Sequence, residues 1–114
     1  MYKFEKLKVW AEILKLIKLV YNVIDKLPAS ERYGLADELR RAVISIALNL
    51  AERCGASSDK EFRSFIKISI KSQYETVAAL KIIENLYPRI NIQKQLAQAE
   101  IVGKMLHGLF RSIK

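Results

Sequence analysis

The chain has 114 residues, of which 51% are hydrophobic and 28% charged, with only 4 Gly and 2 Pro. This composition indicates a single all-helical domain over residues 1–114, large enough to bury a core without disulfides or metal. The 20 Lys and Arg outnumber the 12 Asp and Glu, which gives a net charge of +8. Such an excess favours anionic partners, nucleic acid first, and the alternative is a solubility charge on a small basic protein.

The cysteine count and the distribution of apolar residues predict a cytoplasmic protein. The lone Cys54 has no partner for an internal disulfide. Charged and bulky residues alternate at the N-terminus, unlike the apolar segment of a signal peptide. The longest uncharged run, residues 42–51, is ten residues long, whereas a membrane span needs ~20. We therefore expect no membrane association.

Apolar residues at three-and-four spacing predict a first helix over residues 7–26. The repeating residues are Trp10, Ile13, Leu14, Ile17, Val20, Tyr21, Ile24 and Leu27. Further apolar residues widen this stripe beyond what one core needs, namely Val9, Leu16, Leu19 and Val23. Pro28 ends the helix because it lacks an N–H donor and restricts the backbone of the residue before it.

A second helix is predicted over residues 35–53, after a short turn capped by Ser30 and Glu31 and a bend at Gly34. Gly55 is expected in the left-handed conformation just beyond its end. One apolar face holds Leu39, Val43, Ile46 and Leu50, and another holds Ile44, Leu48 and Ala51. A polar stripe, Glu38, Arg41, Ser45, Asn49 and Glu52, runs between them. Two apolar faces need two sets of partners, which predicts a bundle that also associates with copies of itself.

The segment from Ser58 to Glu61 matches a capping box and predicts a third helix that ends at residue 86 or 87, before Pro88. Its expected core residues are Phe62, Ile66, Val77, Leu80 and Ile83. A fourth helix is expected over residues 92–113, with Ile92, Leu96, Ala99, Leu106, Leu109 and Ile113 on its apolar side. Short loops between helices ~30 Å long enforce antiparallel neighbours. The predicted fold class is all-α, an up-down-up-down four-helix bundle.

The residues give little support for an enzyme, a metal site or a cofactor. His107 is the one histidine, and no carboxylate or nucleophile lies near it in sequence, so a packing role is favoured over a catalytic one. One Cys and one His cannot supply zinc spacing, and the chain has no Glu-x-x-His pair, haem motif or glycine-rich phosphate loop. We therefore predict a non-enzymatic protein with no catalytic, cofactor-binding or metal residues.

Basic residues are the better candidates for a functional site. Lys60, Arg63, Lys67 and Lys71 are three or four apart and form one ridge on the third helix, suited to phosphates but not to reading bases. The candidate nucleic-acid-binding residues are Arg40, Arg41, Arg63, Lys67 and Lys71. The alternative is a solvated face with ion pairs from Asp37, Asp59 and Glu75, which contribute only ~0.2–0.5 kcal/mol each.

Small polar residues also follow one side of the third helix, at Ser69, Ser72 and Thr76. If they face Ser45 and the rest of the polar stripe, a hydrogen-bonded layer crosses the bundle or a subunit contact. The simpler alternative is that both stripes face water. The apolar faces beside the stripe favour the interface.

Three motifs, EKLKVW, ERYGLADELRRAVISIALNLAE and EFRSFIKISIKSQYE, resemble those of the small four-helix-bundle proteins encoded in 23S rRNA intervening sequences. The matching positions are Tyr33, Gly34, Leu35, Arg40, Arg41, Ser45, Ile46, Asn49, Ala51 and Glu52. The chain departs at Leu50, Arg53, Ala47 and Lys71, where relatives often carry Ile, Gly, Pro and Gly. The charge at Arg53 implies a different loop after the second helix.

This resemblance implies a cytoplasmic prokaryotic protein, a left-handed antiparallel bundle and assembly into a pentameric ring. The accessory protein of diversity-generating retroelements is a distant relative that binds nucleic acid and a reverse transcriptase. That relation supports RNA binding only by analogy.

Two functions from different classes follow. The first is a non-enzymatic homo-oligomer that binds structured RNA or another nucleic acid through its clustered Arg and Lys side chains. The second is a protein-interaction scaffold, in which the ring docks a partner protein and the positive charge is incidental. An enzyme ranks third.

Overall fold

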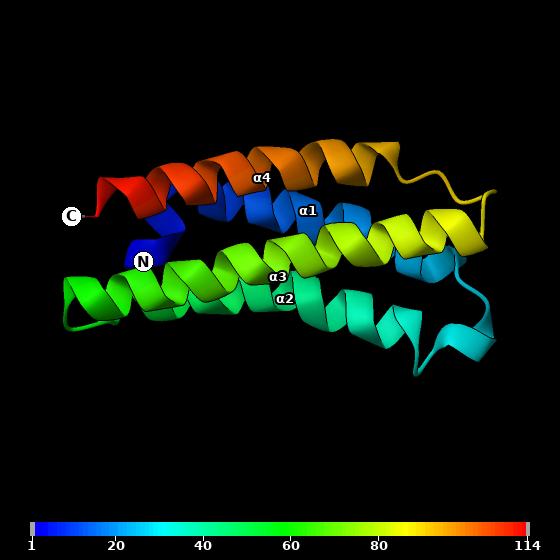
Figure 1. Cartoon of the computed structure of the whole chain (residues 1–114), viewed down its shortest axis with the longest axis horizontal. Coiled ribbons are helices and arrows are strands. Elements are labelled where there is room, and N and C mark those ends of the chain that lie inside the picture. Colours follow the sequence, from blue (N-terminus) through cyan, green and yellow to red (C-terminus); the bar gives the residue numbers. More distant parts are fainter. Residues whose placement is uncertain (1, 114) are drawn as a thin grey trace.

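The computed structural model describes residues 2–113 as four long helices joined by short connections (Figure 1). Helix α1 spans Lys8–Lys26, α2 spans Leu35–Arg53, α3 spans Asp59–Leu86 and α4 spans Gln93–Ser112. Short 3-10 helices precede α1 and α2, η1 at Lys3–Lys6 and η2 at Ala29–Glu31. The predicted all-α four-helix bundle is confirmed.

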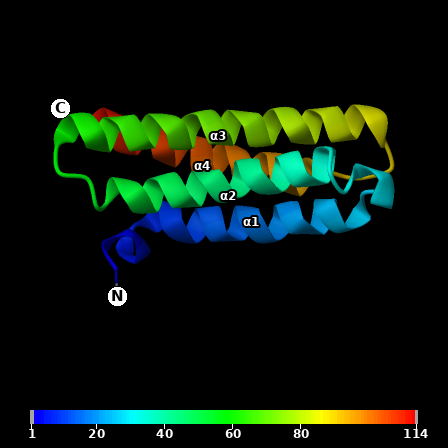
Figure 2. The ribbon, with the colours of Figure 1, turned by 90° about the horizontal axis from the view of Figure 1, so that it is seen from below.

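Each helix packs against two others. Helix α1 contacts α2 and α4, and α3 contacts the same two helices, with the most extensive packing between α2 and α3. The loops lie at alternate ends of the rod, so each helix returns along the one before it (Figure 1, Figure 2). The rod measures 44 × 24 × 24 Å. The left-handed twist stays a prediction.

One apolar core runs the length of the rod and draws on all four helices. Its largest fully buried side chains are Ile13, Leu16, Leu39, Ile46, Leu50, Ile66, Leu80, Ile83, Ile92 and Leu106. The full set of buried residues recurs every three or four positions along each helix, because that spacing returns a side chain to the same side of a helix. Each such side chain contributes about 1.5–3 kcal/mol by leaving water.

The buried side of α1 is rotated from the predicted one. Val9, Leu16 and Val23, expected only to widen the stripe, are buried in the core. Leu14 and Tyr21, expected within the stripe, are instead exposed. Apolar residues cover so much of this helix that their spacing does not locate the middle of the buried side.

The connection after α2 also differs from the prediction. No glycine among residues 2–113 has a positive φ, so the left-handed conformation expected at Gly55 is wrong. Cys54 ends α2 with right-handed backbone angles, and the N–H of Gly55 donates to the Glu52 carbonyl at 3.0 Å. The chain leaves the helix through one further right-handed turn, which needs no special φ.

Ser58 begins α3 as predicted, since its hydroxyl accepts a hydrogen bond from the Glu61 N–H at 3.2 Å. The second hydrogen bond of the capping box, in which the Glu61 side chain reaches back to the backbone of Ser58, is replaced by another contact. The Glu61 carboxylate accepts from the Ser57 hydroxyl at 3.5 Å.

The polar stripe of α2 meets that of α3 inside the chain. The hydroxyl groups of Ser45 and Ser72 lie 2.8 Å apart, and the Ser69 hydroxyl donates to the Ile46 carbonyl at 2.6 Å. Asn49 donates to the Ser45 hydroxyl at 3.0 Å. Of the alternatives left open by the sequence, the hydrogen-bonded layer is present inside the chain, between α2 and α3, whereas Glu52 lies at the surface.

Candidate nucleic-acid interface

The predicted ridge lies on the outer side of α3. Lys60, Lys67 and Lys71 are exposed and Arg63 is half-buried. The opposite side of the helix holds the buried polar residues Ser69, Ser72, Gln73 and Thr76. Because those residues are fixed against α2 and α4, the helix turns its basic side to solvent.

The ridge is less neutralised than the solvated-face alternative required. That alternative expected ion pairs between Asp59 and Arg63 and between Glu75 and Lys71. Within residues 2–113, no carboxylate oxygen lies within 4.0 Å of a side-chain nitrogen of the ridge. The ion pairs in this part of the chain involve Lys15, Arg40, Arg41 and Lys104 instead. The ridge thus presents its charge to solvent.

The arginine pair on α2 has a different environment. Arg40 lies 3.7 Å and Arg41 3.5 Å from carboxylate oxygens of Asp37, and Arg41 also lies 3.8 Å from Glu38. The predicted pairs with Asp37 are therefore present. Exposed pairs of this kind contribute only about 0–1 kcal/mol, but they reduce the positive potential nearby.

The structure therefore brings together only part of the predicted site. Arg63, Lys67 and Lys71 share one side of α3, whereas Arg40 and Arg41 lie on α2 among acidic residues.

The sequence interpretation missed one aromatic residue on the same helix. Tyr74 follows Lys71 by three residues, and 62% of its surface is exposed. Its ring centroid lies 6.4 Å from that of His107 on α4. The available signal was its spacing from the lysines, which places it on their side of the helix.

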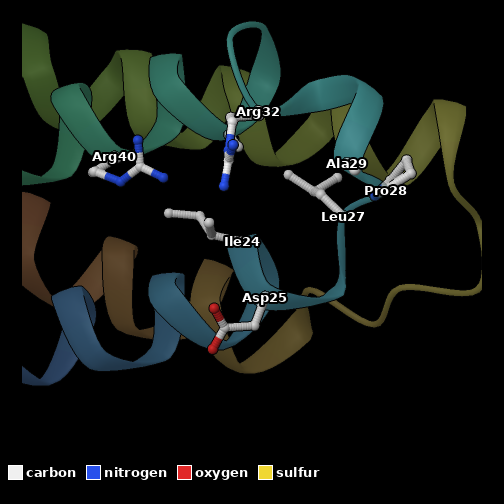
Figure 3. A pocket seen from close by; sticks show the side chains of 8 residues that line it. Ile24, Asp25, Leu27, Pro28, Ala29, Arg32 and Arg40 are labelled. Carbon is white, nitrogen blue, oxygen red and sulfur yellow. The ribbon is translucent and has the colours of Figure 1, made fainter.

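A cavity of about 400 Å³ lies where the end of α1 meets the start of α2 (Figure 3). Arg32 and Arg40 reach it from one side, and Ile24 and Asp25 from the other (Figure 3). The remaining lining is Leu27, Pro28, Ala29 and Ala36. Within residues 2–113, no hydrogen bond or ion pair joins Asp25 to either arginine. The cavity offers charges over an apolar floor, without a nucleophile held by a base.

Hydrogen bonds shift two pKa values at sites away from the ridge. The pKa of Glu12 is lowered by the hydrogen bond from Gln98 and then by Lys15. The pKa of Tyr87 is raised because its hydroxyl donates to the Glu31 carboxylate. Each of these hydrogen bonds joins two segments of the chain. The first joins α1 to α4, and the second joins η2 to the end of α3, so both stabilise the packing of the bundle.

Residues 2–113 lack two features that would change the interpretation of the site. No three His, Cys, Asp or Glu side chains lie close enough together to hold a metal ion. None of the helices in this part of the chain is long and apolar enough to cross a membrane.

The sequence motifs and the helical fold both agree with one known protein family. The model of the 23S rRNA-intervening sequence protein family matches residues 5–108, which include all of α1, α2 and α3 and most of α4. None of the curated proteins compared with the chain matches it. Since the family match spans most of the chain and the fold is a helical bundle, this protein belongs to the 23S rRNA-intervening sequence protein family.

Proposed function

We propose that this protein is a non-enzymatic homo-oligomer, a pentameric ring, that binds structured RNA through the basic ridge of α3. The observation that carries the proposal is the row of Lys60, Arg63, Lys67 and Lys71. Within residues 2–113 this row has no carboxylate within 4.0 Å. Phosphates supply the missing negative charge and release counterions as they bind.

Self-association is supported by apolar side chains that the single chain leaves exposed or only partly covered. We define the α1–α2 apolar face as Trp10, Leu14, Ile17, Tyr21, Ile44 and Leu48. Leu48 is 57% exposed and Leu14 is 42% exposed. A second copy that covers this face removes apolar surface from water, at about 25 cal/mol per Å².

The two halves of this face lie along one seam. On α1 its residues continue by helical spacing to Ile24, and on α2 they continue back to Arg40. Ile24 and Arg40 line the same cavity, and Figure 2 shows α1 beside α2 along their length. The exposed apolar stripes of the two helices therefore run side by side.

Assembly strengthens a weak site. Each chain carries +8, so a ring repeats the ridge once for every subunit. Several phosphate contacts then act together, and their combined affinity exceeds that of one ridge. We expect little sequence preference, because contacts to phosphates do not read bases.

The test is binding of 23S rRNA fragments over a range of salt concentrations. We expect affinity to fall steeply from low to moderate salt. Lys67→Gln/Lys71→Gln should weaken binding and flatten this slope. A control of equal charge change, Lys18→Gln/Lys26→Gln on α1, should have less effect. Absent or salt-independent binding contradicts the proposal.

A protein-interaction scaffold is the second candidate, favoured by exposed apolar residues near the end of α3. Ile82 and Leu86 are both exposed and lie outside the α1–α2 apolar face. In this case the oligomer purifies without RNA, and Ile82→Ser/Leu86→Ser abolishes capture of a partner protein.

A further inference from the structure

Tyr74 is an exposed residue beside the basic ridge, and phosphate binding by the ridge does not explain its role. It is an exposed aromatic residue one helical turn beyond Lys71 and two turns beyond Lys67. Along the axis of α3 these distances are about 4.5 and 10.5 Å, within reach of long lysine side chains. The ring and the cations thus share one continuous strip of surface.

Neighbouring contacts fix the direction in which Tyr74 points. Gln73, directly before it, is buried and donates to the Ala99 carbonyl of α4 at 2.9 Å. Thr76, two residues later, is buried and donates to the Ser72 carbonyl at 2.9 Å. With 100° of rotation per residue, the helix must turn Tyr74 outward between them.

Helix α4 supports the ring from one side. The ring planes of His107 and Tyr74 are inclined by 47° with centroids 6.4 Å apart, so the two rings are tilted against each other. His107 is half-buried. It therefore limits the positions of the tyrosine ring and leaves much of that ring open to solvent.

An exposed aromatic ring among cations suits one class of partner. Every nucleic-acid base has a flat face that stacks on a tyrosine, while lysines hold the phosphates beside it. A base inside a duplex is already stacked and paired, so only an unpaired base is available. The charge of the ridge disfavours a cationic or apolar partner here.

We propose that Tyr74 is a stacking platform for an unpaired base of the bound RNA, with Lys67 and Lys71 holding the adjoining phosphates. This inference rests on the proposed function, and it narrows the partner to RNA with single-stranded loops or bulges. His107 positions the ring without contacting the base.

The experiment compares two RNAs of equal length and charge, a hairpin with an unpaired loop and a fully paired duplex. Tyr74→Leu should weaken hairpin binding by roughly tenfold and leave duplex binding unchanged. Tyr74→Phe should retain hairpin binding because it keeps the ring. Tyr33→Leu is the matched control, since Tyr33 is 87% exposed but lies before α2.

A fluorescent base analogue in the loop gives a second readout. Its emission should be quenched by the wild-type protein and by Tyr74→Phe, and not by Tyr74→Leu. If Tyr74→Leu binds and quenches like the wild type while Lys67→Gln/Lys71→Gln loses affinity, stacking is wrong and the proposed function stands. Equal losses on hairpin and duplex also overturn stacking. If the wild type binds neither RNA, the proposed function fails and this inference with it.

Discussion

At the scale of single residues, Gly103 and Gln73 form a close contact that joins α4 to α3. A Cβ atom at position 103 would lie 2.9 Å from Gln73 Nε2 and 3.1 Å from its Cδ. Gln73 is buried, and its amide group donates to the Ala99 carbonyl. Glycine within a helix is unfavourable by about 0.5–1 kcal/mol relative to alanine, so this position accepts that cost to let the two helices approach.

Gly103→Ala should therefore lower the free energy of unfolding, by about 1–2 kcal/mol, because the Gln73 side chain must move and its buried amide group loses a partner. Urea denaturation measures the change. Gly108→Ala in the same helix is the control, since its Cβ would meet nothing closer than an Arg111 nitrogen at 4.0 Å. We expect this control to stabilise the protein by about 0.5–1 kcal/mol. Equal stabilisation by both substitutions contradicts the packing argument.

Tyr87 provides a prediction about pH. Its hydroxyl donates to Glu31 Oε2 at 2.5 Å, which raises its pKa above the ordinary value of 10.0. A raised pKa in the folded state means that the stability from this bond is present below pH 10 and is lost as the pH rises through the folded value. Wild type should therefore be more stable than Tyr87→Phe at neutral pH, with the difference shrinking in strong alkali. A stability difference between wild type and Tyr87→Phe that stays constant with pH would contradict this explanation.

At the scale of helices, the bond between Ser45 and Ser72 fixes how α2 lies against α3. Each hydroxyl is held by a second constraint, since Ser45 also accepts from Asn49 and Ser72 is buried. A hydrogen bond in such a setting contributes about 0.5–1.5 kcal/mol. The layer therefore sets the relative register of the two helices as well as adding stability.

A double-mutant cycle tests this layer. Ser45→Ala and Ser72→Ala should each destabilise the protein, and the double variant should lose less than the two losses added together, by about 1 kcal/mol. The free energy of unfolding of all four proteins gives the coupling. Strict additivity would mean that the two hydroxyl groups do not interact.

The helices also show how far the sequence could predict this structure. The bounds of α2 follow from spacing and local turn residues. Spacing also aligns the polar stripes of α2 and α3, but it left open whether they meet each other or face water, and the packing of α2 on α3 decides that. The residue spacing does not predict which side of α1 is buried, because this helix is apolar around much of its circumference. The hydrogen bond from Gln73 to the Ala99 carbonyl depends on α3 packing against α4. The spacing of residues within each helix does not predict which helices become neighbours.

The candidate site was only partly predictable for a related reason. Spacing alone places Arg63, Lys67 and Lys71 on one side of a helix. Whether Asp59 or Glu75 neutralises them depends on side-chain positions, and within residues 2–113 they do not come within 4.0 Å. The placement of Tyr74 beside His107 requires the packing of α3 on α4.

At the scale of the whole molecule, the α1–α2 apolar face and the basic ridge lie on different helices. The α1–α2 apolar face belongs to one side of the rod, and the ridge belongs to α3. Such a separation allows copies to pack through one surface and to leave the other free for phosphates.

Leu14→Ser/Leu48→Ser should weaken this packing without unfolding the chain, because both side chains are exposed in the single chain. We expect the oligomer to dissociate at a concentration at which the wild type stays assembled. Sedimentation velocity measures this, with circular dichroism to confirm helical content. The control is Ile101→Ser on α4, which removes an exposed apolar side chain outside the face. If the double variant assembles like the wild type, the interface lies elsewhere.

The mass of the purified particle in solution, measured by light scattering up to high concentration, shows whether copies of the chain associate. One chain has a mass of 13.1 kDa. We expect a particle of several chains, five for the ring, because the exposed apolar side chains of α1 and α2 require a second copy to cover them. A particle that keeps the mass of one chain at every concentration would contradict the account.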